Sequence, residues 1–226
     1  MIFGIGDDYW NLSIVERNSN FPLLPNGKNT VLSGKALDYL ANCVSLWERI
    51  VTDLPESDIA DKACWLSGLC CSQFGQPDNA VKYLALLVDK FPNSQYASRA
   101  PYKIGVIYRD QKQFDQAFEW FTRQRTQYPN DKSQSERALM SLAAVYFYDY
   151  KDYRNAALIY RQYTEEYPQS EKLSAVYWGL ANCHEKLGDI KQAIAVLEES
   201  LTKFTDTQFV KDVQNRLEYL QKGWMQ

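Results

Sequence analysis

Histidine, glycine and paired cysteines are scarce in this chain. One histidine, His184, and 10 glycines occur among 226 residues, and no CxxC pair is present. A structural zinc site needs four converging ligands, which CxxC pairs and histidines usually supply. Few glycines and many aromatic residues suit packed helices better than a loop-rich β protein. We therefore expect a helical protein without a metal site or a cofactor.

A basic excess and a long apolar run are absent as well. The formal net charge is −3 and the isoelectric point is about 5.3, whereas nucleic-acid-binding proteins usually present a basic face. No apolar run approaches the roughly 20 residues of a membrane span. The apolar start lacks the basic residues of a signal peptide and meets Asp7 and Asp8. These features predict a cytoplasmic protein that binds no nucleic acid and has no membrane span. A periplasmic location is the alternative if Met1 replaced an export signal.

The cysteines form no recognisable disulfide framework. Their number is odd, and disulfide frameworks belong mainly to small secreted domains. All five stand in apolar, helical surroundings, which predicts buried free thiols: Cys43, Cys64, Cys70, Cys71 and Cys183.

A unit recurs along the chain. Pro55, Pro92, Pro129, Pro168 and Thr205 each follow an aromatic residue or a leucine, at intervals of 37, 37, 39 and 37 residues. A constant period of this length is typical of stacked repeats. A single repeat cannot bury its own apolar face, so the repeats are expected to stack on one another.

Each interval has the pattern of a helix, a tight turn and a second helix. In the last full unit, apolar residues recur at helical spacing on both sides of the sequence LGD. Gly188 suits the left-handed end of the first helix, and Asp189 can cap the second. In every second helix a small residue precedes a large one by four positions, which predicts a close helix crossing: Ala80 and Leu84, Ala117 and Phe121, Ala156 and Tyr160, Ala193 and Leu197.

This pattern resembles the tetratricopeptide repeat over about residues 56–205. The period near 37 and the YPxS junction are similar to the bacterial subgroup found in outer-membrane assembly lipoproteins and in periplasmic partners of the Tol–Pal system. The resemblance implies an all-α, right-handed α-solenoid of stacked helix-turn-helix repeats. Two units carry the signature most fully: Tyr177, Leu180, Ala181, Gly188, Ala193, Leu197 and Thr205 in one, and Ile104, Gly105, Tyr108, Ala117, Phe121 and Pro129 in the other.

Two units depart from the pattern. Pro101 stands where a helix former is usual, so we expect that helix to start late, near Ser98. The third unit is two residues longer than the others, and the register of its first helix is ambiguous around LAAVYFYDYKDY.

The ends of the chain differ from its middle. Residues 1–33 are expected to form an irregular N-terminal segment, because FPLLPNGKNT is rich in Pro, Asn and Gly. The solenoid is predicted over 34–226, with a leading amphipathic helix at 34–54 and four helical hairpins at about 56–204. A capping helix with a polar outer face is predicted at 206–222.

The sequence contains no recognisable catalytic constellation. Cys183, His184 and Glu185 point to different sides of one helix, because adjacent helical residues diverge by roughly 100°. No G-x-S-x-G nucleophile elbow is present. We therefore expect His184 to be a packed side chain, and we expect no catalytic residue and no enzymatic activity.

The resemblance implies that the first helix of each repeat lines a concave surface. Exposed Trp, Tyr and Arg side chains there favour a protein or peptide partner. The alternative is that Trp65 and Trp178 only pack between helices. Glu185 also falls at an inner position. The candidate partner-binding residues are Lys62, Trp65, Arg99, Tyr102, Arg109, Trp178 and Asn182.

Several functions fit these observations. The leading hypothesis is a non-catalytic scaffold that binds a peptide segment or subunit of a larger assembly in its concave groove. A structural subunit of a stable complex is the second. The resemblance also allows an exported helper of envelope assembly, or a carboxylate-clamp adaptor, although the basic clamp positions are matched only by Asn182, Lys62 and Arg99.

Overall fold

The computed structural model describes residues 34–205 and 207–224 of the chain. Within these residues the protein consists of α-helices, one 3-10 segment and one π-helix, and no strand is present. The predicted all-α fold is confirmed. The expected irregular segment 1–33 lies outside the described residues. No helix in the described part of the chain is both long and apolar enough to cross a bilayer.

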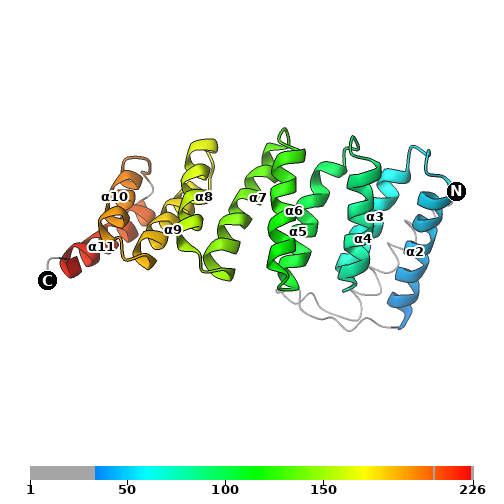
Figure 1. Cartoon of the computed structure of the whole chain (residues 1–226), viewed down its shortest axis with the longest axis horizontal. Helices are drawn as coiled ribbons and strands as arrows, with labels where there is room; N and C mark the ends of the chain where they lie inside the picture. The colour runs from blue at the N-terminus through cyan, green and yellow to red at the C-terminus, as the bar shows by residue number, and fades with distance from the viewer. Residues whose placement is uncertain (1–33, 206, 225–226) are drawn as a thin grey trace. The chain divides into compact units, whose positions relative to one another are not determined.

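The chain divides into two compact units, and the first ends at Gln124. Helices α2 to α5 of unit 1 pack against each other in chain order (Figure 1). Gly105 lets α5 approach α6, since an added Cβ would lie 2.6 Å from the Phe121 ring. The elements of unit 1 are α2 (Gly34–Asp53), α3 (Ala60–Gln73), α4 (Pro77–Lys90), the 3-10 segment η1 (Ala97–Arg99), α5 (Ala100–Asp110) and the larger part of α6 (Phe114–Gln127).

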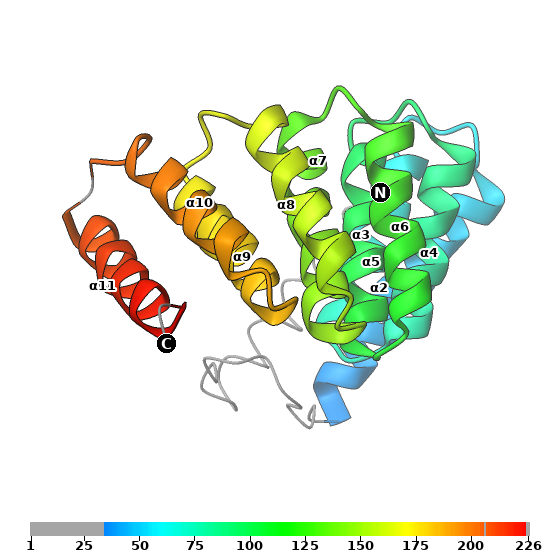
Figure 2. The same cartoon turned by 60° about the vertical axis from the view of Figure 1, so that its left-hand side comes forward.

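Unit 2 begins at Arg125 and continues the same alternation of first and second helices. Each helix again packs against the next one along the chain, as Figure 2 shows for α8 to α11. The elements are α7 (Lys132–Ala144), the π-helix η2 (Val145–Asp149), α8 (Tyr153–Glu166), α9 (Leu173–Lys186), α10 (Ile190–Leu201) and α11 (Thr207–Trp224).

The turns inside the four hairpins share one conformation. Gly75, Lys112, Lys151 and Gly188 stand at equivalent positions and have φ between 56° and 76°. This confirms the left-handed end predicted at Gly188. The following helix is capped by an aspartate side chain in the later hairpins; Asp189, for example, accepts a hydrogen bond from the Gln192 backbone at 3.3 Å.

The predicted helix crossings form the core of both units. Ala80, Ala117, Ala156 and Ala193 are all 0% exposed. The large residues four positions later are buried too, and they fill the layers between helices as the spacing predicts: Leu84, Phe121, Tyr160 and Leu197.

The two repeats that depart from the sequence pattern are accommodated by local changes in helix structure. Pro101 lies in the first turn of α5, where its missing N–H is harmless, and the 3-10 segment η1 precedes it. The two extra residues of the third repeat lie before Asp152. There the π-helix η2 extends the first helix, with the Tyr150 N–H donating to the Val145 carbonyl at 2.9 Å.

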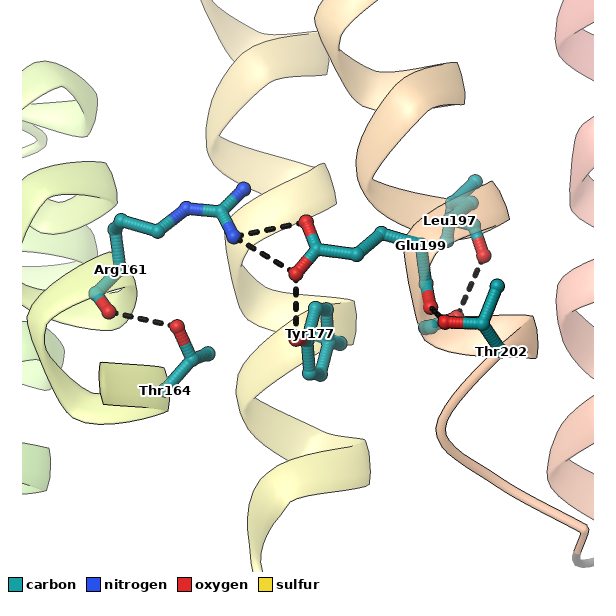
Figure 3. Close-up of polar contacts among 7 residues, drawn as sticks. Arg161, Thr164, Tyr177, Leu197, Glu199 and Thr202 are labelled. Carbon is teal, nitrogen blue, oxygen red and sulfur yellow. Dashed lines mark hydrogen bonds and ion pairs between the residues drawn. The ribbon is translucent and has the colours of Figure 1, made fainter. Parts of the chain in front are cut away.

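A polar bridge ties three helices of unit 2 together (Figure 3). Arg161 on α8 and Glu199 on α10 pair at 2.8 Å, and the Tyr177 hydroxyl on α9 donates to Glu199 at 2.7 Å. Although burial acts to raise it, the hydrogen bonds from Tyr177 and Arg161 lower the pKa of Glu199. The carboxylate therefore stays charged and holds α8, α9 and α10 in register.

Candidate functional site

A groove with a cavity volume of about 1020 Å³ lies on the first helices of unit 2. Most of its lining comes from α7, α9 and α11, and the π-helix η2 and helix α8 add one tyrosine each. We call it the first-helix groove. Its lining residues are Met140, Ala144, Tyr148, Tyr160, Ser174, Ala175, Trp178, Gly179, Asn182, Glu185, Phe209, Asp212, Asn215, Arg216 and Tyr219.

The floor of the groove depends on a close approach of two helices. A Cβ added to Gly179 on α9 would lie 2.7 Å from the ring of Tyr160 on α8. Any larger residue at this position would displace the Tyr160 ring or push α9 away from α8. The glycine therefore deepens the groove, and it leaves the half-buried Trp178 as the large side chain beside it.

Two tyrosines stand out into solvent around this floor. Tyr148 on η2 is 65% exposed, and Tyr219 on α11 is 75% exposed. Single exposed apolar residues are common, but aromatic side chains that gather around one groove are typical of an interaction site. Tyrosine supplies a large contact area at a low entropic cost, which makes it frequent in protein interfaces.

A polar cluster connects α9 to α11 inside the groove. The Arg216 guanidinium donates to both carboxylate oxygens of Glu185, at 2.7 and 2.8 Å, and to the Asn182 amide oxygen at 2.8 Å. The same guanidinium lies over the Trp178 ring, 4.6 Å from its centroid. Charge-assisted bidentate pairing and cation–π contact together fix the Arg216 side chain.

Asn182 has a hydrogen-bond donor that is unused within the described part of the chain. Its amide oxygen is used by Arg216, while its amide nitrogen has no partner among the described residues. Because Asn182 lines the groove, this NH₂ group can donate to a carbonyl of a bound polypeptide.

Two of the predicted partner-binding residues, Trp178 and Asn182, line the first-helix groove. The prediction that Glu185 lies on the inner face also agrees with its position in the groove. The remaining five belong to unit 1, on α3, η1 and α5. A single surface through all seven residues stays a prediction. The five in unit 1 are Lys62, Trp65, Arg99, Tyr102 and Arg109.

The predicted partial exposure is wrong for Trp65. Its side chain is 9% exposed, and its ring stacks on Tyr96 with centroids 6.2 Å apart. Tyr96 follows α4 and covers the tryptophan from the next repeat. Tyr102 is half-buried, with its ring 5.7 Å from that of Phe121. Trp65 is therefore covered by packing within unit 1, and its role as a partner-binding residue stays a prediction.

Sequence reasoning missed most of the remaining groove residues. One period of 37 residues after Trp178 and Asn182 stand Asn215 and Tyr219, so treating the capping helix as a further first helix would have found them. Tyr148 was hidden by the π-helix, which shifts the helical register of the third repeat.

His184 lies on α9 outside the groove lining. It is half-buried, and its Nδ1 atom has no hydrogen-bond partner within the described residues. Burial lowers the pKa of the imidazole. No group of three or more His, Cys, Asp or Glu side chains in the described part of the chain is placed to hold a metal ion.

Comparisons with known proteins bear on the fold. No curated protein matches the sequence. The structure is similar to the apo form of RapI, with a TM-score of 0.60 and 14% identity over 97% of this chain and 68% of that chain. BtubC (BKLC) from P. vanneervenii gives a TM-score of 0.59 at 12% identity, covering 96% and 82%. MamA from Desulfovibrio magneticus RS-1 gives 0.54 at 16% identity, covering 89% and 97%.

Family models for the tetratricopeptide repeat match three segments of the sequence. One model matches residues 65–94 and 137–170, and a second matches residues 174–202. These segments fall on the hairpins α3–α4, α7–α8 and α9–α10. The sequence matches and the helical hairpins coincide, and the chain therefore contains tetratricopeptide repeats.

Proposed function

We propose that the chain is a non-catalytic scaffold whose first-helix groove binds a peptide segment or a subunit of a larger assembly. Folds of tetratricopeptide repeats generally mediate protein–protein interaction. The observation that carries the proposal is the pair of exposed tyrosines, Tyr148 and Tyr219, beside the unused amide donor of Asn182. Aromatic contact area and a donor for a backbone carbonyl are the two things that a peptide groove needs.

Rigidity of the groove supports this function. Its walls are helices, Gly179 permits close packing of α9 on the Tyr160 ring of α8, and Val213, Leu217 and Leu220 anchor α11 in the core of unit 2. A site that is already formed spends little binding free energy on ordering its own side chains.

A peptide selection tests the proposal. A random peptide library is displayed against the full chain, and the affinities of the recovered peptides are measured by calorimetry. Tyr148→Ala, Tyr219→Ala and Asn182→Ala are expected to weaken binding, each tyrosine change by about 2 kcal/mol or roughly thirty-fold, because exposed aromatic anchors dominate such interfaces.

Tyr150→Ala is the matched control for Tyr148→Ala. Tyr150 is 39% exposed and stands two residues away, but it does not line the groove. Affinity that is unchanged in all three groove variants, or lowered equally in Tyr150→Ala, would contradict the proposal. Circular dichroism of each variant checks that the helices are intact.

The structural-subunit and envelope-assembly roles stay predictions. The same selection bears on them, because a chain whose groove recovers no peptide must meet its partners through other surfaces.

A further inference from the structure

Three residues of α9 form a site for a guanidinium group. Trp178, Asn182 and Glu185 are spaced by four and three residues, so they lie on one face of the helix. They offer an aromatic ring, an amide oxygen and a carboxylate. These are the complementary groups for a planar, charged fork of N–H donors.

In this structure the occupant of the site comes from the chain itself. Arg216 on α11 makes a bidentate pair with Glu185 at 2.7 and 2.8 Å, bonds Asn182 at 2.8 Å and stacks on Trp178. The side chain of Arg216 is 27% exposed, and that of Glu185 is 19% exposed. The pair is therefore shielded but reachable from the groove.

The Arg216 side chain can leave the site without moving its helix. Helix α11 is anchored by Val213, Leu217 and Leu220, which are 0%, 8% and 6% exposed and belong to the core of unit 2. Rotation of one long side chain on this anchored helix would open the site to the groove.

The groove without Arg216 is acidic. Its formally charged lining residues would then be Glu185 and Asp212, both carboxylates. Charge complementarity favours a cationic occupant, and the bidentate geometry at Glu185 favours arginine over lysine.

We propose that the first-helix groove recognises a polypeptide segment that carries an arginine flanked by apolar residues, and that Arg216 is an internal competitor for the arginine position. This inference rests on the proposed function of the groove. The internal arginine is tethered next to its site at a high effective concentration, so it weakens the binding of an incoming arginine. Arg216 sets the threshold for occupancy, while Tyr148 and Tyr219 contact the flanking residues.

Two synthetic peptide pools test the inference. Both have the same mixed apolar flanks; one has a fixed central arginine, and the other has citrulline, a neutral isostere of arginine. Calorimetry on the full chain should show that Arg216→Ala binds the arginine pool at least about ten-fold more tightly than the wild-type chain does. It should also prefer arginine over citrulline by about ten-fold or more. A gain of affinity on removing a groove residue is the opposite of what a direct ligand contact predicts.

Three further variants sharpen the test. Arg216→Gln keeps part of the hydrocarbon stem and should show the same gain. The test therefore stays valid if Arg216→Ala loses stability. Adding Glu185→Gln to either variant should abolish the preference for arginine. Arg125→Ala removes a similar pair, with Glu166 at 2.6 Å and outside the groove, and should bind like the wild-type chain.

Equal binding of the two pools by both Arg216 variants, or no gain over the wild-type chain, would overturn the inference. The experiments distinguish failure of this inference from failure of the proposed function. If the peptide selection returns groove-dependent peptides without arginine, the groove function stands and the arginine site falls. If it returns no groove-dependent peptide, the pools still measure the guanidinium site by itself.

Discussion

His184 is the clearest case of a single residue held in an uncharged state. Its Nδ1 atom is buried without a partner among the described residues. Burial lowers the pKa of the imidazole; Asp189 opposes this effect and Arg161 adds to it. The ring fills an aromatic position of the repeat, and a proton on it would be poorly accommodated.

Replacing His184 by phenylalanine should therefore change the pH dependence of stability. The unfolded chain takes up a proton near its ordinary pKa of about 6.5, whereas the folded chain takes it up only at lower pH. The free energy of unfolding of the wild-type chain thus falls as pH drops below about 6.5, and this contribution disappears in His184→Phe. Urea unfolding at about pH 7.5 should show a change under about 1.5 kcal/mol, because volume is kept.

Urea unfolding of the wild-type chain and of His184→Phe is then repeated at about pH 5.5. His184→Phe should gain stability relative to the wild-type chain between the two pH values. A wild-type chain that is relatively more stable at the lower pH would mean that the imidazole gains a partner when it is protonated.

Residue-level predictions succeeded where sequence neighbours determine the outcome. The buried alanines and Gly188 follow from helical spacing and turn chemistry alone. The environments of Trp65 and Arg216 depend on side chains about 30 residues away, Tyr96 and Glu185. Spacing within one helix cannot show which distant side chain covers a tryptophan or fills a site.

At the scale of the helical hairpin, one turn conformation serves two residue types. Gly75 and Gly188 have φ of 74° and 76°, while Lys112 and Lys151 have 61° and 56°. Residues with a Cβ avoid this region of backbone conformation. The two lysine turns are therefore strained relative to the two glycine turns.

Exchanging the residue types should exchange the stabilities. Lys112→Gly is expected to raise the free energy of unfolding by about 0.5–1 kcal/mol, because relief of strain exceeds the added freedom of the unfolded chain. Gly188→Ala should lower it by about 1 kcal/mol. An added Cβ at position 188 meets no atom within 4 Å, so this loss would be conformational and not steric.

Urea denaturation of the two variants measures both changes. Gly75→Ala makes the same change as Gly188→Ala at the equivalent turn of the first hairpin, where an added Cβ also meets no atom within 4 Å. A neutral Gly188→Ala together with a destabilising Lys112→Gly would show that the lysine side chain compensates for the turn through contacts of its own.

The third hairpin is the one whose helix register the repeat period does not predict. Its neighbours follow the repeat period, so their helices could be assigned from the sequence. The π-helix η2 changes the number of residues per turn, and this carries Tyr148 to a position that no constant spacing predicts. The feature that broke the pattern is also the one that supplies a tyrosine of the groove.

At the scale of the whole molecule, polar bridges recur between the second helices of successive repeats. Each joins residues more than 30 positions apart, and each is at least partly exposed to solvent, so its individual contribution is modest. They secure the register between neighbours and leave the stacking energy to the apolar layers. The bridges are Glu48–Lys82, Asp89–Arg123, Arg125–Glu166 and Arg161–Glu199.

If each repeat is stabilised mainly by its neighbours, the reactivity of the five cysteines toward a thiol reagent should show it. All five are buried and free. Burial raises the pKa of Cys64 and of Cys183 to about 12, so few thiolates exist at neutral pH. A thiol reagent should label the native chain slowly and should find five thiols in denaturant. A denatured count of three or one would reveal disulfides.

Labelling of each cysteine should respond to nearby destabilisation only. Leu180→Ala removes a side chain that is 1% exposed from the helix that carries Cys183, a loss of about 2–5 kcal/mol. Cys183 should then react much faster, while Cys43 on α2 keeps its rate, because a repeat passes strain chiefly to its neighbours. Leu84→Ala removes a buried side chain that packs on Gly68 of α3, the helix of Cys64, Cys70 and Cys71, and should give the reverse. Mass spectrometry resolves the rates, and an equal acceleration of both cysteines in both variants would mean that the repeats open as one cooperative structure.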